Sequence, residues 1–201
     1  MLNTEPEKTG VTDQSWKRLA DFVFELGMLR RTPRTGYQFL GSGAENVAEH
    51  SFRTAMIGYI LARKAGADVA RTVFLCLFHD VHEARIGDFN YVNRIYNTSD
   101  PVLAFTHALE GTGLRVEVLE LWHELEAGET LEARLAQDNL KEEQDLGNPY
   151  AAKWLAHAVP RLKTDFARDL ARGIQSADQS DWWFERPDAS WWRKGNGKPR
   201  P

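Results

Sequence analysis

Val73-Phe-Leu-Cys-Leu-Phe-His-Asp80 is the stretch that decides the fold: six apolar residues followed by adjacent histidine and aspartate. An uncharged run of this length fits a buried helix or a short buried strand, and periodicity alone does not separate the two. Helical spacing in the neighbouring segments, and the lack of any second strand candidate, favour a helix. We therefore expect a helix over about residues 68–80, and its continuous apolar run predicts burial on every side.

The rest of the chain shows the same helical spacing of apolar residues. Five more helices are expected, over about residues 16–26, 45–63, 114–125, 131–138 and 161–178. In the first of these, Trp16, Leu19, Val23 and Leu26 form one apolar stripe, which is typical of a helix face that packs on a core. Gly128 is placed to end the third of these five helices. The fold class is therefore all-α, with a flexible N-terminus at 1–11, one helical domain at 12–180 and an aromatic C-terminal segment and flexible tail at 181–201.

Composition narrows the classes of function. The 201 residues are 42% hydrophobic and 27% charged with a net charge of −4, which is ordinary for a globular domain and argues against a nucleic-acid polymer as partner. The only cysteine, Cys76, allows no intrachain disulfide, which favours a reducing compartment. No apolar stretch reaches the ~18 residues of a membrane span. The polar start resembles no secretory signal, so the expected location is cytoplasmic.

Three positions suggest a metal site. His50 shares a helical face with Ile57 and Leu61, so its imidazole should point inward, although a single inward histidine is usually a hydrogen-bonded core residue. His79 and Asp80 end a buried helix, and an imidazole with a carboxylate suits a divalent ion such as Mn, Fe, Co, Ni or Zn. The alternative is that Asp80 caps or begins the next turn.

Asp138 is the fourth candidate. It follows Leu131 and Leu135 on an otherwise apolar helical face, and a buried carboxylate is costly unless it is paired, hydrogen-bonded or bound to a metal. Asp145 lies on the same face two turns later and is the rival. We favour Asp138, because the stretch between the two aspartates is highly charged and resembles solvated surface.

Several motifs together resemble the HD-domain phosphohydrolases, and more narrowly the branch that includes bacterial 5′-deoxynucleotidases and their eukaryotic relatives. The likeness covers about residues 15–145, and its order of His, His-Asp and Asp is specific only as a set. The segments that carry it are Arg31-Thr-Pro-Arg-Thr-Gly-Tyr37, Ala44-Glu-Asn-Val-Ala-Glu-His-Ser51, His79-Asp-Val-His-Glu83, Ile86-Gly-Asp88, Leu121-Trp-His-Glu124, Glu132-Ala133 and Gln137-Asp138.

The resemblance implies an HD-type helical bundle that binds one divalent metal ion (Mn, Co, Fe, Ni, Zn or Mg). Its protein ligands would be His50, His79, Asp80 and Asp138, with water and a phosphate oxygen completing the shell. His82 has no ligand role in that pattern; a His79-x-x-His82 pair with Glu83 is the geometric alternative. The resemblance, together with the many C-terminal tryptophans, also implies a homodimer.

The remaining site residues follow from spacing and from the resemblance. Glu83 lies four residues after His79, so it shares that face if the helix continues, and it could orient or deprotonate an attacking water. The resemblance implies that Asp88 acts near the leaving oxygen, as general acid or as an orienter of a sugar hydroxyl. Arg34 would contact the phosphate or the sugar. The ordinary alternatives are a surface carboxylate for Glu83 and a helix cap for Asp88.

The expected function is hydrolysis of a phosphomonoester by metal-activated water, with nucleoside 5′-monophosphates, deoxynucleotides among them, as the leading substrates. Two departures leave the substrate open: residues 38–43 lack the basic and polar residues usual in that branch, and residues 89–96 are unusually aromatic. Tyr91 and Tyr96 could stack on a base, but core packing is their ordinary use.

Two alternatives remain. One is hydrolysis of another small phosphate ester or of a cyclic phosphodiester, which often needs two metals; the other histidines, His107, His123 and His157, show no recognisable ligand spacing. The other is a non-catalytic helical binding module, which would need neither Glu83 nor Asp88.

Overall fold

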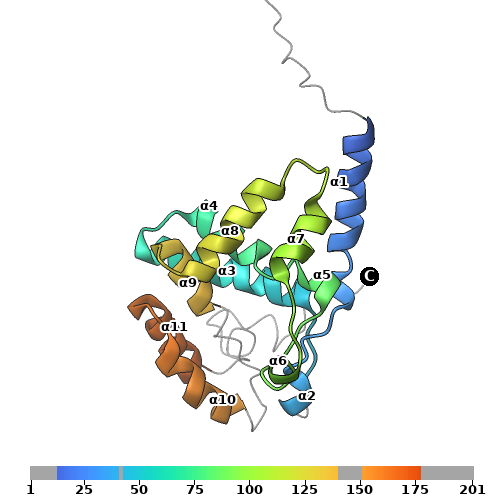
Figure 1. Cartoon of the computed structure of the whole chain (residues 1–201). Coiled ribbons are helices and arrows are strands. Elements are labelled where there is room, and N and C mark those ends of the chain that lie inside the picture. The colour runs from blue at the N-terminus through green and yellow to red at the C-terminus, as the bar shows by residue number, and fades with distance from the viewer. Residues whose placement is uncertain (1–12, 41–42, 140–150, 178–201) are drawn as a thin grey trace, which may run out of the picture.

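The computed structural model describes residues 13–40, 43–139 and 151–177. These residues are helical with no β-strand among them; an isolated bridge joins Pro33 to Asn46. The elements, labelled in Figure 1, are α1 (Asp13–Leu26), η1 (Leu29–Arg31), α2 (Tyr37–Leu40), α3 (Val47–Ala65), α4 (Val69–Phe78), α5 (Glu83–Ile86), α6 (Asn93–Tyr96), α7 (Pro101–Leu109), α8 (Arg115–Ala127), α9 (Leu131–Asn139), α10 (Ala151–Ala158), η2 (Val159–Arg161) and α11 (Asp165–Ser176). The all-α prediction is confirmed.

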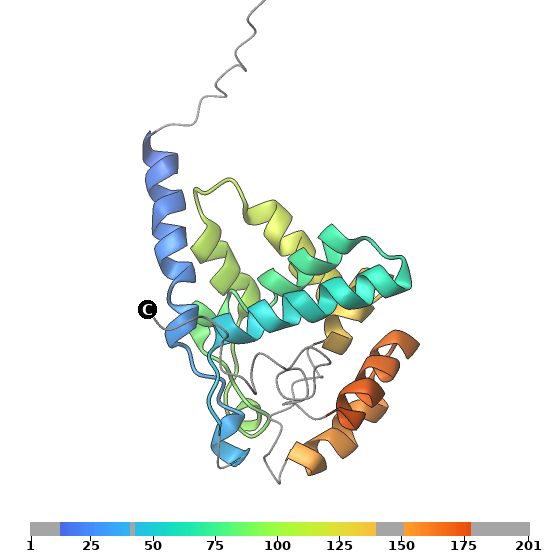
Figure 2. The ribbon, with the colours of Figure 1, turned by 180° about the vertical axis from the view of Figure 1, so that it is seen from behind.

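The pair α3 and α4 forms the centre of the molecule. Gly66 ends α3 in the left-handed conformation, with a φ of 69°, and the Asp68 carboxylate begins α4 by accepting the amide of Arg71 at 2.9 Å. This short turn brings α4 back along α3. Helices α8 and α9 pack on α4, and α9 and α11 pack on α3. Figure 2 shows α3 running across the molecule, with α1 at one edge and α10 and α11 at the other.

Burial around α4 is less complete than the sequence predicts. Its buried residues are Thr72, Leu75 and Cys76, whereas Phe74 is 49% exposed and Leu77 is 38% exposed. The physical reason is that α3, α8 and α9 cover only part of the circumference of the helix. The prediction of a helix here is confirmed, and the prediction of burial on every side is wrong.

Helix α1 also differs from its expected packing. Trp16 and Val23, two members of the predicted apolar stripe, are 61% and 63% exposed, and the residue that α1 buries fully is Phe22. The helix lies along the edge of the bundle, where it contacts α7 (Figure 1). The last helix is shorter than expected, because Thr164 is extended and caps α11. The aromatic segment at 181–201 and the N-terminus at 1–11 lie outside the described residues.

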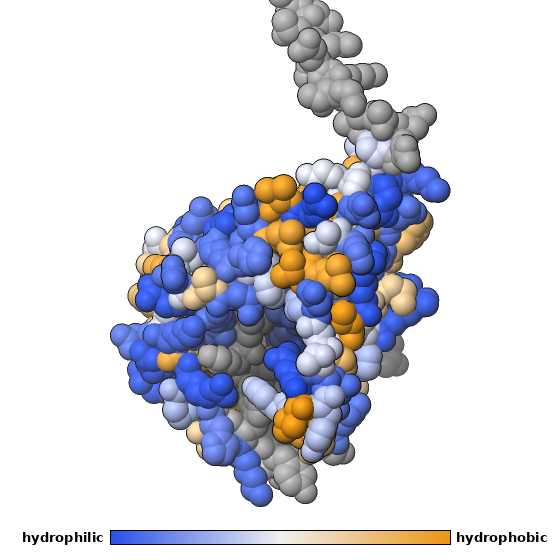
Figure 3. Space-filling model, in the orientation of Figure 1, coloured by the Kyte–Doolittle hydropathy of each residue, from blue (hydrophilic) through white to orange (hydrophobic). Residues whose placement is uncertain are grey.

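None of the helices in the described ranges combines the length and the hydropathy needed to cross a bilayer. The face in Figure 3 is mostly hydrophilic, with a band of apolar side chains over α7 and α8, the helices of the exposed residues Leu103 and Val116.

Phe105 of α7 supports both the core and the site. Its ring is fully buried and lies 5.1 Å from the ring of His82. We expect Phe105→Ala to lower the free energy of unfolding by about 3–5 kcal/mol, because it leaves a cavity in a packed core. Urea denaturation followed by circular dichroism measures the change. Phe24→Ala is the matched control: Phe24 is 77% exposed, so the loss should stay below about 0.5 kcal/mol. Equal losses in the two variants would contradict the packing described here.

Candidate metal centre

Three of the predicted metal ligands meet where α4 ends. His50 comes from the first turns of α3, and His79 and Asp80 follow the last residue of α4. The Nε2 atoms of the two histidines are 3.0 Å apart, and Oδ2 of Asp80 lies 2.7 Å from Nε2 of His79 and 3.4 Å from Nε2 of His50. Both imidazoles are buried. Their ligand atoms, with one from Asp80, all lie within 4.8 Å of one another.

The orientation of His79 is fixed by its second ring nitrogen. Nδ1 lies 2.6 Å from the carbonyl oxygen of Cys76, one turn back in α4, so Nδ1–H donates to that oxygen. A neutral imidazole carries a single N–H, so Nε2 of His79 then presents a lone pair. That lone pair faces the Asp80 carboxylate, which is also an acceptor. Two acceptors 2.7 Å apart require an additional proton or a cation between them.

The donor set fits a divalent ion. Two ligand atoms about 2.1 Å from the same ion and at right angles to each other are about 3 Å apart, which matches the observed separations. Two imidazoles and a carboxylate suit Zn, Fe, Co, Ni or Mn. Burial alone would raise the pKa of Asp80, but the charges and hydrogen bonds of His79 and His50 hold it well below its ordinary value. Asp80 is therefore ionised and ready to bind a cation.

Glu83 adds a buried carboxyl group beside this cluster. It begins α5 and is 4% exposed, and its Oε2 has no hydrogen-bond partner in the described part of the chain. Burial, followed by the negative charges of Asp80 and Asp88, raises the pKa of Glu83 from 4.5 to about 10. Without a metal ion, Glu83 is therefore protonated at neutral pH. The site holds more acidic groups than it can keep ionised without a bound cation.

Asp88 is held by the loop between η1 and α2. Gly87 turns the chain after α5 with a φ of 78°, a conformation that favours glycine. Oδ2 of Asp88 accepts the backbone N–H of Thr35 at 2.6 Å, and Oδ1 lies 3.7 Å from Nη1 of Arg34. Asp88 therefore caps no helix; Asn90 caps the short helix α6 instead, accepting the amides of residues 92 and 93.

Arg34 connects the two acidic parts of the site. The bridge to the start of α3 fixes its backbone, with its N–H donating to the carbonyl oxygen of Glu45 at 2.9 Å. Its Nη1 atom lies 3.3 Å from Oδ2 of Asp80 and 3.7 Å from Oδ1 of Asp88. In this arrangement the guanidinium holds carboxylates of the site itself.

Asp138 does not join the ligand cluster. Its side chain is fully buried, as predicted, but Oδ1 accepts the backbone N–H of Lys163 at 2.6 Å and Oδ2 accepts that of Thr164 at 2.7 Å. The cluster of ligand atoms among the described residues consists of His50, His79 and Asp80. The carboxylate thus satisfies the amides that precede α11 and ties α9 to it. The rival candidate, Asp145, lies outside the described residues.

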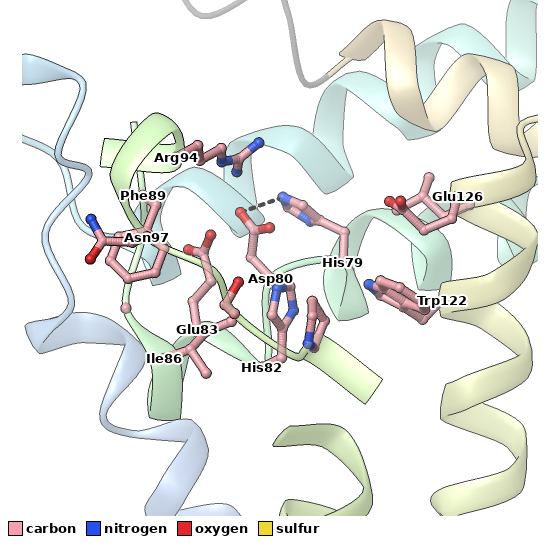
Figure 4. Close-up of a pocket in the computed structure, with 14 residues that line it drawn as sticks. His79, Asp80, His82, Glu83, Ile86, Phe89, Arg94, Asn97, Trp122 and Glu126 are labelled. Carbon is pink, nitrogen blue, oxygen red and sulfur yellow. Dashed lines mark ion pairs between the residues drawn. The ribbon is translucent and has the colours of Figure 1, made fainter. Parts of the chain in front are cut away.

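A pocket of about 390 Å³ opens beside the cluster (Figure 4). Its polar lining includes four side chains that sequence reasoning missed, namely Arg94, Asn97, Trp122 and Glu126. They come from α6, the loop after it and α8, so no spacing within one element could reveal them. His82 also lines the pocket, but it is not part of the ligand cluster, and the alternative His79-x-x-His82 metal pair finds no support here.

The raised pKa of Glu83 predicts how stability depends on pH in the metal-free protein. Between pH 4.5 and about 10 the unfolded chain loses this proton while the folded chain keeps it, so the folded state loses stability as pH rises. The side-chain amide of glutamine does not titrate in this pH range. The difference in unfolding free energy between Glu83→Gln and wild type should therefore shift in favour of the variant as pH rises from 5 to 8, by at least about 1 kcal/mol.

Denaturation at several pH values with a chelator present measures this difference. Glu117→Gln removes an exposed carboxyl group of α8 and is the control, whose stability difference from wild type should stay nearly constant. A constant difference for Glu83→Gln as well would contradict the assigned protonation state.

The position of Asp138 predicts a structural role that can be separated from metal binding. In Asp138→Asn, one of the two amides at residues 163 and 164 loses its acceptor, because a single amide oxygen replaces two carboxylate oxygens. We expect the unfolding free energy of the metal-free protein to fall by about 1–3 kcal/mol, with the metal content of the loaded protein unchanged. Denaturation and metal analysis measure the two quantities. Complete loss of metal without loss of metal-free stability would restore Asp138 as a ligand.

Comparison with known proteins agrees with this arrangement. A family model described as the HD domain matches residues 26–172. Among the relatives, 5′-deoxynucleotidase HDDC2 from Danio rerio is 29% identical over 132 residues, which are 61% of this chain and 65% of the relative. The protein of the same name from Homo sapiens is 28% identical over 127 residues, which are 60% of this chain and 62% of the relative. This chain therefore covers less than two thirds of the length of either relative.

The fold also occurs in solved structures. A conserved hypothetical protein from Pyrococcus furiosus has a TM-score of 0.62 at 26% identity, with 79% of this chain and 99% of that chain covered. The family match runs from the end of α1 into α11 and includes the two histidines and the aspartate that meet at the end of α4. The chain belongs to the HD domain family.

Proposed function

We propose that this protein is a metal-dependent phosphohydrolase that releases phosphate from a nucleoside 5′-monophosphate, deoxynucleotides among them. The observation that carries the proposal is the convergence of His50, His79 and Asp80 beside the buried carboxyl group of Glu83, at the wall of a pocket. The names of its relatives, which are 5′-deoxynucleotidases, support the choice of substrate.

His50, His79 and Asp80 would hold one divalent ion, predicted to be Mn, Co, Fe, Ni, Zn or Mg. Such an ion lowers the pKa of a bound water and offsets phosphate charge. The carbonyl oxygen of Cys76 keeps the His79 ring in the tautomer whose Nε2 can bind a metal. Three protein ligands leave coordination positions for water and substrate, which is the arrangement of a catalytic rather than a structural site.

Glu83 would take the proton of the attacking water. In the metal-free protein its pKa of about 10 keeps it protonated, chiefly through burial and the charge of Asp80. When Asp80 shares its charge with a cation, this repulsion weakens and Glu83 can ionise. A buried carboxylate beside the cluster then acts as the general base.

Asp88 would act as an orienter rather than as a general acid. A general acid needs a proton to donate, but Oδ2 of Asp88 accepts the N–H of Thr35 and Oδ1 faces the Arg34 guanidinium. Both carboxyl oxygens therefore already face N–H groups of the protein. Asp88 would therefore accept a hydrogen bond from a substrate hydroxyl or hold Arg34 in place.

The pocket suits a substrate of nucleotide size. Pockets for small molecules are typically about 300–1,000 Å³, and the volume here, about 390 Å³, lies toward the small end of that range. The half-buried indole of Trp122 offers an aromatic surface for a base or sugar. A homodimer and a cytoplasmic location remain predictions from the sequence.

A phosphate-release screen tests the proposal directly. Purified protein is given deoxyribo- and ribonucleoside 5′-monophosphates and a cyclic phosphodiester, each with Mn, Co, Ni, Zn or Mg. We expect metal-dependent release from the monophosphates, abolished by a chelator. His79→Ala should lose bound metal and lower the rate by more than about a hundredfold. Loss of an outer-shell partner alone costs up to about a hundredfold, and a direct ligand should cost more.

Two further variants serve as controls. His107→Ala removes an exposed histidine of α7 and should behave as wild type. Glu83→Gln should keep its metal while losing turnover. No release from any monophosphate by fully loaded protein would overturn the proposal, and so would stoichiometric metal with normal turnover in His79→Ala.

A further inference from the structure

An arginine other than Arg34 lines the pocket. We infer that Arg94 of α6 binds the phosphate group of the substrate, while Arg34 chiefly positions the carboxylates of the site. This inference rests on the proposed function, because it assigns the phosphate of the same substrate. It also departs from the sequence-based expectation, which gave the phosphate contact to Arg34.

Arg94 lies close to the ligand cluster of His50, His79 and Asp80. It lines the pocket together with His79, Asp80 and Glu83. In Figure 4 its guanidinium extends from α6 toward the His79–Asp80 pair. The positive charge of Arg94 also opposes the rise in the pKa of Glu83, which places the two groups within electrostatic range of each other.

Arg94 differs from the other arginines near the site because its guanidinium is not engaged by a carboxylate of the described residues. Arg34 contacts Asp80 and Asp88, and Arg53 forms an ion pair with Glu45. Among the described residues that line the pocket, Arg94 is the only arginine or lysine, and no hydrogen bond or ion pair joins its guanidinium to another described residue. A guanidinium binds phosphate oxygens through two parallel N–H donors, so this side chain suits a phosphate group.

The backbone that carries Arg94 is anchored to the loop of Arg34. Asn90 caps α6, and its Nδ2 donates to Oγ1 of Thr35 at 3.1 Å and to the Thr35 carbonyl oxygen at 3.3 Å. The backbone N–H of Asn90 donates to the same hydroxyl at 3.0 Å. These bonds fix the start of α6 relative to the residue that also binds Asp88. The side chain of Arg94 therefore extends over the pocket from a fixed base.

The charge of the pocket explains why this arginine is needed. Asp80, Glu83 and Glu126 all line it, and carboxylates repel a phosphate dianion. Arg94 offsets part of this negative charge next to the ligand cluster. Glu126 lies on the opposite side of the pocket, on α8 (Figure 4). The phosphate should therefore sit between the cluster and Arg94, and the rest of the substrate should extend toward α8.

Binding of inorganic phosphate tests the inference without requiring turnover. Calorimetry on the metal-loaded protein gives the Kd for phosphate in wild type, Arg94→Gln, Arg94→Lys and Arg34→Gln. We expect Arg94→Gln to weaken phosphate binding by about 10- to 100-fold, as expected for a lost charge-assisted hydrogen bond. Arg94→Lys should recover part of the loss, because it keeps the charge but not the paired donors.

Kinetics with the best monophosphate substrate give a second measurement. Arg94→Gln should raise KM by a similar factor, with metal content unchanged. Arg63→Gln removes an exposed arginine in the last turn of α3 and is the matched control, which should change neither Kd nor KM.

The outcomes separate this inference from the proposed function. An unchanged Kd and KM in Arg94→Gln, or no phosphate binding by wild type, would overturn the role of Arg94 even if nucleotides are hydrolysed. Loss of phosphate binding only in Arg34→Gln would return the phosphate contact to Arg34. Phosphate binding that depends on Arg94, in a protein that hydrolyses no phosphomonoester, would uphold the inference and overturn only the proposed reaction.

Discussion

The site depends on one hydrogen bond, from Nδ1 of His79 to the carbonyl oxygen of Cys76 within the last turn of α4. In a neutral ring this bond uses the single N–H, so the lone pair of Nε2 then faces Asp80 and His50. Lone pairs and a carboxylate held this close in a buried place repel one another unless an additional proton or a cation lies between them. Glu83 is neutral in the metal-free protein for a related reason, because burial, followed by the negative charges of Asp80 and Asp88, raises its pKa.

The substrate side of the site depends on a different network, centred on Thr35. Its backbone N–H binds Asp88 and its hydroxyl accepts the amide of Asn90, so the loop between η1 and α2 joins the chain after α5 and the start of α6. Two arginines with different environments result. Arg34 lies among carboxylates, and Arg94 extends over the pocket. The same residue type can therefore perform two distinct tasks, and its neighbours decide which one.

Much of the fold and part of the site could be predicted, and the failures have clear physical causes. Asp138 shows the limit best: its position on an apolar face correctly predicted burial, whereas its role as a ligand stays a prediction, because its carboxylate accepts two backbone amides before α11. A buried acid must find donors or cations, and sequence does not reveal which it finds. Phe74 and Trp16 were expected in the core and are exposed, because hydropathy does not show how much of a helix its neighbours cover.

The sequence by itself determined the helical fold class, the inward face of His50 and the placing of His79 and Asp80 at a helix end, because these follow from periodicity along one helix. Only the tertiary structure decided which side chains meet. The turn at Gly66 sets α4 against α3 and so brings two imidazoles 29 residues apart to 3.0 Å. The pocket wall likewise combines Arg94 from α6 with Trp122 from α8. Such contacts between separate elements depend on how the helices pack and not on any local pattern in the sequence.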